Sequence, residues 1–159
     1  DRVVLEGGSI TIQSVVTGND LQYLWTPNTY LIDTKVATPT AANMLDDITY
    51  TLTVTARGGC TSSDKMFVKV LKFPKIPNTF TPNGDGINET WIIEYLDTYP
   101  NNRVQVFTRT GQLVFESRGY RTPWDGKVNG KPLPFDTYYY IVEPESGRKP
   151  ITGYVTIIK

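Results

Sequence analysis

The stretch that decides the fold is Ile48-Thr49-Tyr50-Thr51-Leu52-Thr53-Val54-Thr55-Ala56. Apolar residues alternate with threonines along it, so an extended strand here has one apolar face and one face of hydroxyls. The same alternation predicts strands at Ser9–Thr17, Gln22–Thr26 and Lys65–Leu71. Clusters of glycine, proline, asparagine and aspartate separate these runs, as turns between strands require. We therefore expect this half of the chain to be all-β.

The second half of the chain continues the pattern with different spacing. Arg109-Thr110-Gly111 predicts a tight hairpin with glycine at the position of positive φ, and Pro144–Arg148 predicts a longer hairpin loop. The strands predicted around these turns are Thr90–Tyr95, Arg103–Thr108, Gln112–Ser117, Thr137–Val142 and Ile151–Ile158.

The boundary between the halves is expected in the segment Leu71–Pro77, where Pro74 and Pro77 interrupt sheet pairing and stiffen the chain. Regularly spaced strands with intervening turns favour sandwiches over barrels. We predict two tandem immunoglobulin-like β-sandwich domains, residues 1–72 and 73–159, joined by a short link.

Composition excludes several classes of function. The chain has 159 residues, with 16 Lys and Arg against 16 Asp and Glu, and this balance predicts no nucleic-acid partner. Histidine is absent, which excludes Ser-His-Asp and Cys-His triads and every His-ligated metal site. The acidic pairs Asp46-Asp47 and Glu143 with Glu145 lie in turns and do not converge as glycosidase carboxylates must. We therefore expect no enzyme.

No apolar run approaches the roughly 18 residues of a membrane-spanning helix. The chain opens Asp1-Arg2-Val3, with neither methionine nor the apolar core of a signal peptide. We expect it to be a piece of a longer protein.

One loop carries a candidate metal site. Between Thr81 and Glu89, the oxygens of Asn83, Asp85 and Glu89 and the carbonyl of Ile87 are suited to calcium. The spacing does not match an EF-hand, because Ile92 would then occupy the position of the bidentate glutamate. The alternative is a tight turn in which Asn and Asp side chains bond to the nearby backbone. We favour the turn, with calcium as the candidate cofactor and no other cofactor expected.

Two aromatic features have both a structural and a binding interpretation. Trp124, followed by Asp125-Gly126, is a sugar-stacking platform on one interpretation and the plug of a sandwich core on the other, which we favour. In Tyr138-Tyr139-Tyr140, alternation places the outer two tyrosines on one face with Val142, and Tyr139 with Ile141 on the other. We expect one face in the core and the other partly exposed or covered by a partner. Exposure of Tyr139 and Ile141 would indicate an interface.

The single cysteine, Cys60, cannot close an internal disulfide or build a thiolate metal site. It follows Arg57-Gly58-Gly59 and directly precedes a predicted strand. We expect it to be buried as a small apolar residue rather than to be a reactive thiol.

The second half resembles a known family in five ordered motifs. They are Ile76-Pro77-Asn78-Thr79-Phe80-Thr81-Pro82-Asn83-Gly84-Asp85-Gly86-Ile87-Asn88, then Val106-Phe107 with Gly111, Trp124-Asp125-Gly126, the segment 129–141, and Gly153–Lys159. The family is the gliding-motility-associated C-terminal domain, the type B sorting signal of the type IX secretion system in Bacteroidota. The resemblance covers residues 73–159, and departs from the family where Glu89 replaces an expected aspartate and Phe135-Asp136 a usual glycine.

The first half resembles the immunoglobulin-like or PKD-like repeats that precede such domains in long surface proteins. Tyr23–Pro27, Thr49–Val54 and Gly59-Cys60 carry this weaker similarity. It implies a stalk or spacer, with a large cell-surface gliding adhesin as one candidate parent.

The resemblance implies that residues 73–159 direct export from the periplasm across the outer membrane, to the cell surface or the medium. The implied partners are the type IX translocon and its outer-membrane accessory proteins. Complementary patches and strand addition are the recognition modes that we expect. The candidate partner-binding residues are Arg148, Lys149, Gly153, Tyr154, Val155, Ile157 and Lys159. The alternatives are a carbohydrate-binding module and an adhesive stalk without a sorting role.

Overall fold

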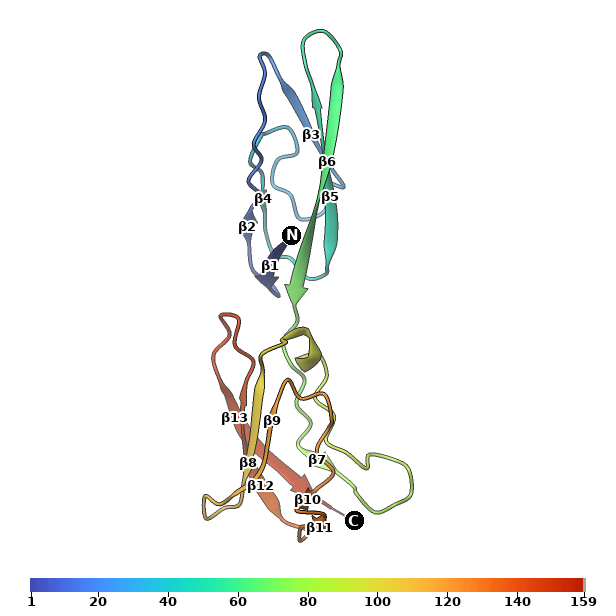
Figure 1. Cartoon of the computed structure of the whole chain (residues 1–159), viewed down its shortest axis with the longest axis vertical. Coiled ribbons are helices and arrows are strands. Elements are labelled where there is room, and N and C mark those ends of the chain that lie inside the picture. Colours follow the sequence, from blue (N-terminus) through green and yellow to red (C-terminus); the bar gives the residue numbers. More distant parts are fainter. Residues whose placement is uncertain (159) are drawn as a thin grey trace. The chain divides into compact units, whose positions relative to one another are not determined.

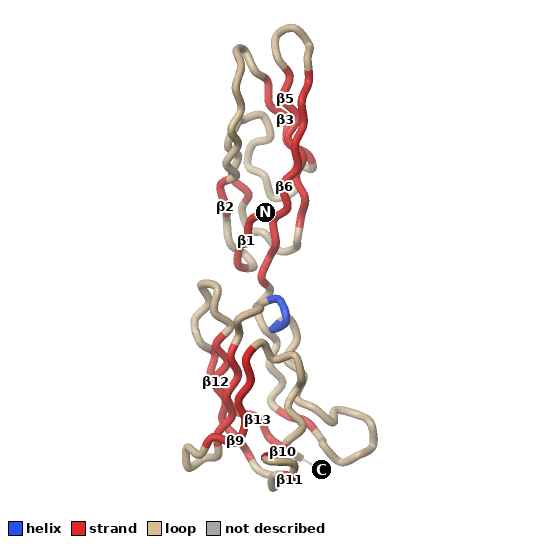
Figure 2. Tube along the Cα trace, viewed as in Figure 1, coloured by secondary structure: helices blue, strands red, loops and turns tan. Residues whose placement is uncertain are grey.

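The computed structural model describes residues 1–158 and divides into two compact units, Asp1–Lys72 (unit 1) and Phe73–Lys159 (unit 2) (Figure 1). In the described residues both units are built from strands, and the one helical element is the short 3-10 helix η1 (Leu96–Thr98) (Figure 2). The predicted all-β class is confirmed.

Unit 1 packs a four-stranded sheet against a short second layer. The sheet has the order β1-β6-β5-β3, with β1 parallel to β6 and the other neighbours antiparallel, and β2 pairs with β4 in the second layer. The strands are β1 (Arg2–Leu5), β2 (Ile10–Thr11), β3 (Gln22–Thr26), β4 (Thr40–Ala41), β5 (Ile48–Thr55) and β6 (Thr61–Leu71).

The alternation of apolar residues with threonines decides which face of β5 is buried. Tyr50, Leu52 and Val54 lie in the core, while the threonines between them face outward. Together with apolar residues of the second layer they form one cluster, whose buried members are Ile12, Trp25, Ala41, Met44, Tyr50, Leu52, Val54, Val68 and Val70.

Unit 2 contains a five-stranded sheet in the order β7-β13-β12-β8-β9. Gly111 has φ 86° in the turn between β8 and β9, so the predicted hairpin is confirmed. β12 and β13 form the second, longer hairpin. The strands are β7 (Thr79–Phe80), β8 (Arg103–Phe107), β9 (Leu113–Arg118), β10 (Lys127–Val128), β11 (Lys131–Pro132), β12 (Thr137–Glu143) and β13 (Ile151–Ile157).

The strand predicted over Ser9–Thr17 is wrong beyond its first residues. Only Ile10 and Thr11 pair with β4. The next backbone bond goes from the Ile12 N–H to the carbonyl of Pro39, and proline has no N–H to return. The ladder therefore ends there, and the chain continues without regular pairing.

The strand predicted over Thr90–Tyr95 is also wrong. Trp91 bridges to Trp124 and Glu94 bridges to Lys75, so the two ends of the segment bond to different parts of the chain and form no ladder. Tyr95 then adopts φ 65°, which turns the chain out of the extended conformation.

Candidate functional site

The loop predicted to bind calcium is closed by its own hydrogen bonds. Asn83 Oδ1 accepts the Asp85 N–H at 3.0 Å, and Asp85 Oδ1 accepts the Ile87 N–H at 2.8 Å. Glu89 Oε1 accepts the Gly86 N–H at 3.0 Å. Side-chain-to-backbone bonds of this kind are those of the tight turn that we favoured.

The fourth candidate oxygen is engaged as well, because the Ile87 carbonyl accepts the Thr81 hydroxyl at 3.1 Å. In residues 1–158, no group of three or more His, Cys, Asp or Glu side chains is placed to hold a metal ion. Each of the carboxylates of Asp85 and Glu89 has a second oxygen, so a calcium site here stays a prediction.

Trp124 is the centre of an aromatic cluster in unit 2. It is 1% exposed, and its ring centroid lies 5.4 Å from Phe80, 5.7 Å from Phe115 and 5.8 Å from Tyr138. Its indole N–H donates to the Lys127 carbonyl. The interpretation as a core plug is confirmed, and a fully buried ring offers no platform to a sugar.

Asp125, next to this plug, holds a turn. Its Oδ1 accepts the Lys127 N–H at 3.1 Å, and Lys127 Nζ lies 2.9 Å from its Oδ2. Partial burial raises the pKa of Asp125, but these contacts with Lys127 outweigh it and the net pKa lies below its ordinary value. The carboxylate therefore stays ionised and acts as a turn residue.

Tyr120 joins two irregular segments of the same cluster, and sequence reasoning missed it. Its hydroxyl donates to the Trp91 carbonyl at 2.5 Å and accepts the Trp124 N–H at 3.1 Å. Burial raises the pKa of Tyr120 far above its ordinary value, so the phenol stays protonated and able to donate. No local pattern marks this residue, because both of its partners are backbone groups and Trp91 lies far from it in the sequence.

The two candidate basic residues of the β12–β13 hairpin differ in their surroundings. Arg148 is half-buried, with its guanidinium carbon 4.8 Å from the Phe73 ring centroid and 5.8 Å from that of Tyr99. Its Nε donates to the Tyr99 hydroxyl at 2.6 Å. Lys149 is exposed. Arg148 therefore has a packing role, and only Lys149 offers its charge on the surface.

The candidate residues of the final strand divide between the two faces of the sheet. Val155 and Ile157 are buried, Tyr154 is half exposed, and Lys159 lies outside the described residues. A Cβ atom on Gly153 would lie 2.5 Å from the Tyr140 hydroxyl oxygen. A residue with a side chain at this position would therefore clash with the Tyr140 ring.

β13 is not open to strand addition along its whole length. It pairs with β12 on one side, and β7 covers its other side at Thr156 and Ile157. The Thr156 N–H donates to the Asn78 carbonyl, and the Ile158 N–H donates to that of Phe80. Strand addition at β13 would be confined to its first residues, from Ile151 to Val155.

The tyrosine run follows the predicted alternation. Tyr138 and Val142 are buried, and Tyr140 packs on Trp91 with ring centroids 5.1 Å apart. Tyr139 faces outward and is half exposed, while Ile141 beside it is partly exposed. The predicted division of β12 into two faces is confirmed, and the structure shows that the face of Tyr138 is the core face.

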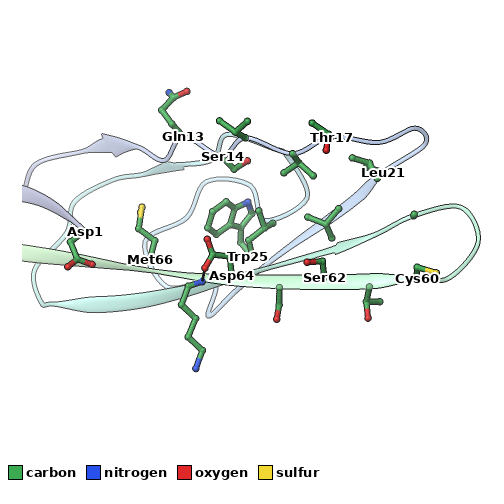
Figure 3. A pocket seen from close by; sticks show the side chains of 18 residues that line it. Asp1, Gln13, Ser14, Thr17, Leu21, Trp25, Cys60, Ser62, Asp64 and Met66 are labelled. Carbon is green, nitrogen blue, oxygen red and sulfur yellow. Dashed lines mark hydrogen bonds between the residues drawn. The ribbon is translucent and has the colours of Figure 1, made fainter.

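The expectation for Cys60 is wrong, because its side chain is exposed. It lies at the end of the β5–β6 hairpin, where the Ala56 N–H bonds to the Cys60 carbonyl and Gly59 has φ 80° (Figure 3). The hairpin tip extends past the last core residue of β5, Val54, so nothing covers the thiol.

A groove of about 770 Å³ lies beside the same sheet in unit 1 (Figure 3). Trp25 lines it from β3, and Leu52 and Val54 line it from β5. Ser62 and Asp64 line it from β6, the next strand of the same sheet. The register places Ser62 opposite Val54 and Asp64 opposite Leu52, so two polar side chains occupy core-facing positions. That interruption of the apolar pattern is the sequence signal of the groove, and our sequence analysis did not use it.

Comparison with known proteins distinguishes the two units. Residues 74–157 match the family model described as the CHU_C type IX secretion signal domain. No curated protein matches the chain. In the described residues, no helix combines the length and apolar character needed to cross a membrane.

Solved structures show the fold. A structure of DIP-gamma IG1+IG2 aligns over 99% of this chain and 92% of its own, with a TM-score of 0.54 at 12% identity. Dpr11 IG1 bound to DIP-gamma IG+IG2 aligns over 99% and 93%, with a TM-score of 0.50 at 10% identity. At these identities the likeness concerns the fold alone, and it confirms the immunoglobulin-like class.

Proposed function

The chain belongs to the family of CHU_C type IX secretion signal domains, and on that premise we propose that unit 2 is the sorting signal of a cell-surface protein. The family match over residues 74–157 is the observation that carries the proposal. Such a signal implies contact with the secretion system and export across the outer membrane. Its work is recognition and not catalysis.

Recognition would take place on the folded surface of unit 2. Among the described members of our candidate set, a partner reaches Lys149 and the exposed side chain of Tyr154 without unfolding the sheet. The partner is the translocon or one of its outer-membrane accessory proteins. Unit 1 is, on this proposal, a stalk or spacer repeat in a surface adhesin of a gliding member of the Bacteroidota.

The test is an export assay in a host with a type IX system. A periplasm-targeted fluorescent protein is fused to residues 1–159, and extracellular fluorescence is compared in cells with and without a working translocon. We expect export only where the translocon works, and loss of export when residues 73–159 are removed. Equal export without residues 73–159 would favour a stalk with no sorting role.

A second candidate function, carbohydrate binding, is supported by the groove of unit 1. Its polar side chains Ser62 and Asp64 beside the apolar wall of Leu52 and Val54 are an arrangement suited to a small polar ligand. A glycan array probed with the whole chain and with Asp64→Ala tests it. Binding that the substitution abolishes would support this function, and no binding by the wild type would remove it.

A further inference from the structure

Four side chains form a continuous row across the outer face of the unit 2 sheet. The register pairs Tyr154 of β13 with Tyr139 of β12, Tyr139 with Phe107 of β8, and Phe107 with Leu113 of β9. Because neighbouring strands lie about 4.8 Å apart, the row spans about 14 Å. We call these four residues the outer row.

The outer row is accessible and rests on a rigid support. Tyr154 is 52% exposed, Tyr139 50% and Leu113 43%, while Phe107 is half-buried between them. The preceding or following residues of the same strands point inward and are fully or nearly buried. They are Tyr138, Val155, Val106 and Val114. Side chains on a packed sheet keep their positions, which favours a preformed contact surface.

The surroundings of the outer row are neutral. On one flank the hydroxyls of Thr137 and Thr156 lie 3.1 Å apart. On the other flank the register places Thr152 and Gln105 on either side of Ile141, and Glu116, which pairs with Arg103, beyond Gln105. The face therefore has an apolar centre and a rim of hydroxyl and amide groups, as the core and rim of a protein interface do.

The nearest charges on this face balance one another. Arg103 Nε lies 2.8 Å from Glu116 Oε1, and Arg103 Nη1 lies 3.6 Å from Glu143 Oε2. Arg118, which is exposed, stands opposite Arg103 in the register and adds a second basic side chain to the same face. Two basic and two acidic side chains leave this part of the face without net charge, so it favours neither an acidic nor a basic ligand. The complementary surface is a neutral one with apolar or aromatic side chains.

We propose that the outer row is the surface by which the type IX translocon recognises this unit, through a folded protein partner with a neutral, apolar contact patch. This inference rests on the proposed function and assigns its recognition site. Tyrosines at the centre of such a patch supply most of the binding free energy of many interfaces. Other large exposed apolar side chains of unit 2, such as Ile92 and Phe135, lie outside the strands of this sheet.

The test compares two double substitutions in the full chain fused to a periplasm-targeted fluorescent protein. Tyr139→Thr with Tyr154→Thr removes both tyrosines and keeps residues with a high preference for strands. Ile92→Ser with Phe135→Ser removes two large apolar side chains outside the outer row. We expect the first variant to lower translocon-dependent export by about tenfold or more, and the second to export as the wild type does.

Three controls make the outcome decisive. Thermal unfolding of both purified variants is compared with the wild type, and if the tyrosine variant unfolds early, Leu113→Thr at the β9 end of the row replaces it. Wild-type export by a folded outer-row variant overturns the inference, whereas failure of the wild type itself to be exported overturns the proposed function. A wild-type dimer in sedimentation that the tyrosine variant abolishes would instead identify a second copy of the chain as the occupant and overturn the translocon assignment.

Discussion

The two units reach the same class of fold with different side chains. Unit 1 is ordered by the regular alternation of β5 and its long pairing with β6, and its core contains one tryptophan, Trp25. Unit 2 joins shorter strands and irregular segments through large rings, above all those of Trp91 and Trp124. A segment that forms no ladder is held chiefly by the apolar surface that it buries, and the large rings of Trp91 and Trp124 bury it for the irregular segments of unit 2. The family match falls on the aromatic unit.

The largest expected difference between the units comes from Trp124→Ala. Removing this buried ring leaves a cavity, and we expect the free energy of unfolding of unit 2 to fall by about 3–5 kcal/mol. Hydrogen exchange measured by mass spectrometry should show lost protection in β12 and β13 and unchanged protection in β5 and β6. Equal loss in both units would contradict the comparison, because it would show that the aromatic cluster supports the whole chain.

Gly153→Ala tests how tightly the rings of unit 2 constrain its backbone. The new Cβ would meet the Tyr140 ring, and we expect a loss of about 2–3 kcal/mol, as for other overpacked cores. The matched control in unit 1 is Thr49→Ala on the exposed face of β5, which should cost less than about 1 kcal/mol. Both are measured by urea unfolding. A Gly153 variant as stable as the wild type would mean that the ring moves freely.

The same substitution made in both units, tyrosine to phenylalanine, compares their buried hydroxyls. Tyr50→Phe removes one bond, to the Thr29 carbonyl at 2.7 Å, and should cost about 1 kcal/mol. Tyr120→Phe leaves both the Trp91 carbonyl and the Trp124 N–H without this partner, so it should cost about 2 kcal/mol. Urea unfolding monitored by circular dichroism gives both values. The reverse order would show that the Tyr120 bonds are not what joins the irregular segments.

Alkaline pH provides a smaller test on Tyr50. Burial, with a contribution from Tyr30, raises the pKa of Tyr50 to about 12 from its ordinary value of 10. The neutral phenol therefore stabilises unit 1 fully below pH 10, and this contribution is lost as the pH rises through about 12. Absorbance of the phenolate during a pH titration, compared between the wild type and Tyr50→Phe, should show one late-titrating group missing from the variant. A group missing near pH 10 instead would contradict the burial argument.

The smallest effect is expected from calcium. Because the loop from Thr81 to Glu89 satisfies its turn with its own side chains, we expect millimolar calcium or a chelator to change the melting temperature by less than a degree or so, an effect below about 0.5 kcal/mol. Asp85→Asn, which keeps an oxygen acceptor, is the matched variant. Calcium stabilisation of the wild type that this variant loses would establish the metal site and refute the turn interpretation.

Sequence alone predicted the features that depend on local periodicity. The alternation of β5 correctly assigned its buried face, and that of Tyr138–Tyr140 correctly divided the side chains of β12 between two faces, because side chains in a strand point to only two sides. It failed at residues 9–17 and 90–95, where the pairing partner decides whether a strand forms, and the partner of Ile12 is a proline. It failed at Cys60, because burial at a hairpin tip depends on how far the hairpin extends past the core.

The candidate site was less predictable, because it depends on which strands pair and in what register. Single residues such as Lys149 and Tyr154 could be chosen from the sequence, but the outer row exists only through the register of four strands. One of its members, Leu113, stands opposite Phe107 only because the register of β8 and β9 shifts between Val106 and Phe107. No spacing in the sequence indicates this shift. The packing of Arg148 on Phe73 and Tyr99 likewise joins residues that are distant in the sequence.

The place of β13 in the sheet has a consequence for protein synthesis. β13 is the last strand described in the chain, yet it lies between β7 and β12, so the five-stranded sheet cannot close until residues 151–157 have left the ribosome. A translation product that stops earlier has no partner for β7 and lacks one of the two outward tyrosines. A signal built in this way is completed only after β13 has been translated, so a chain terminated before residue 151 does not carry it.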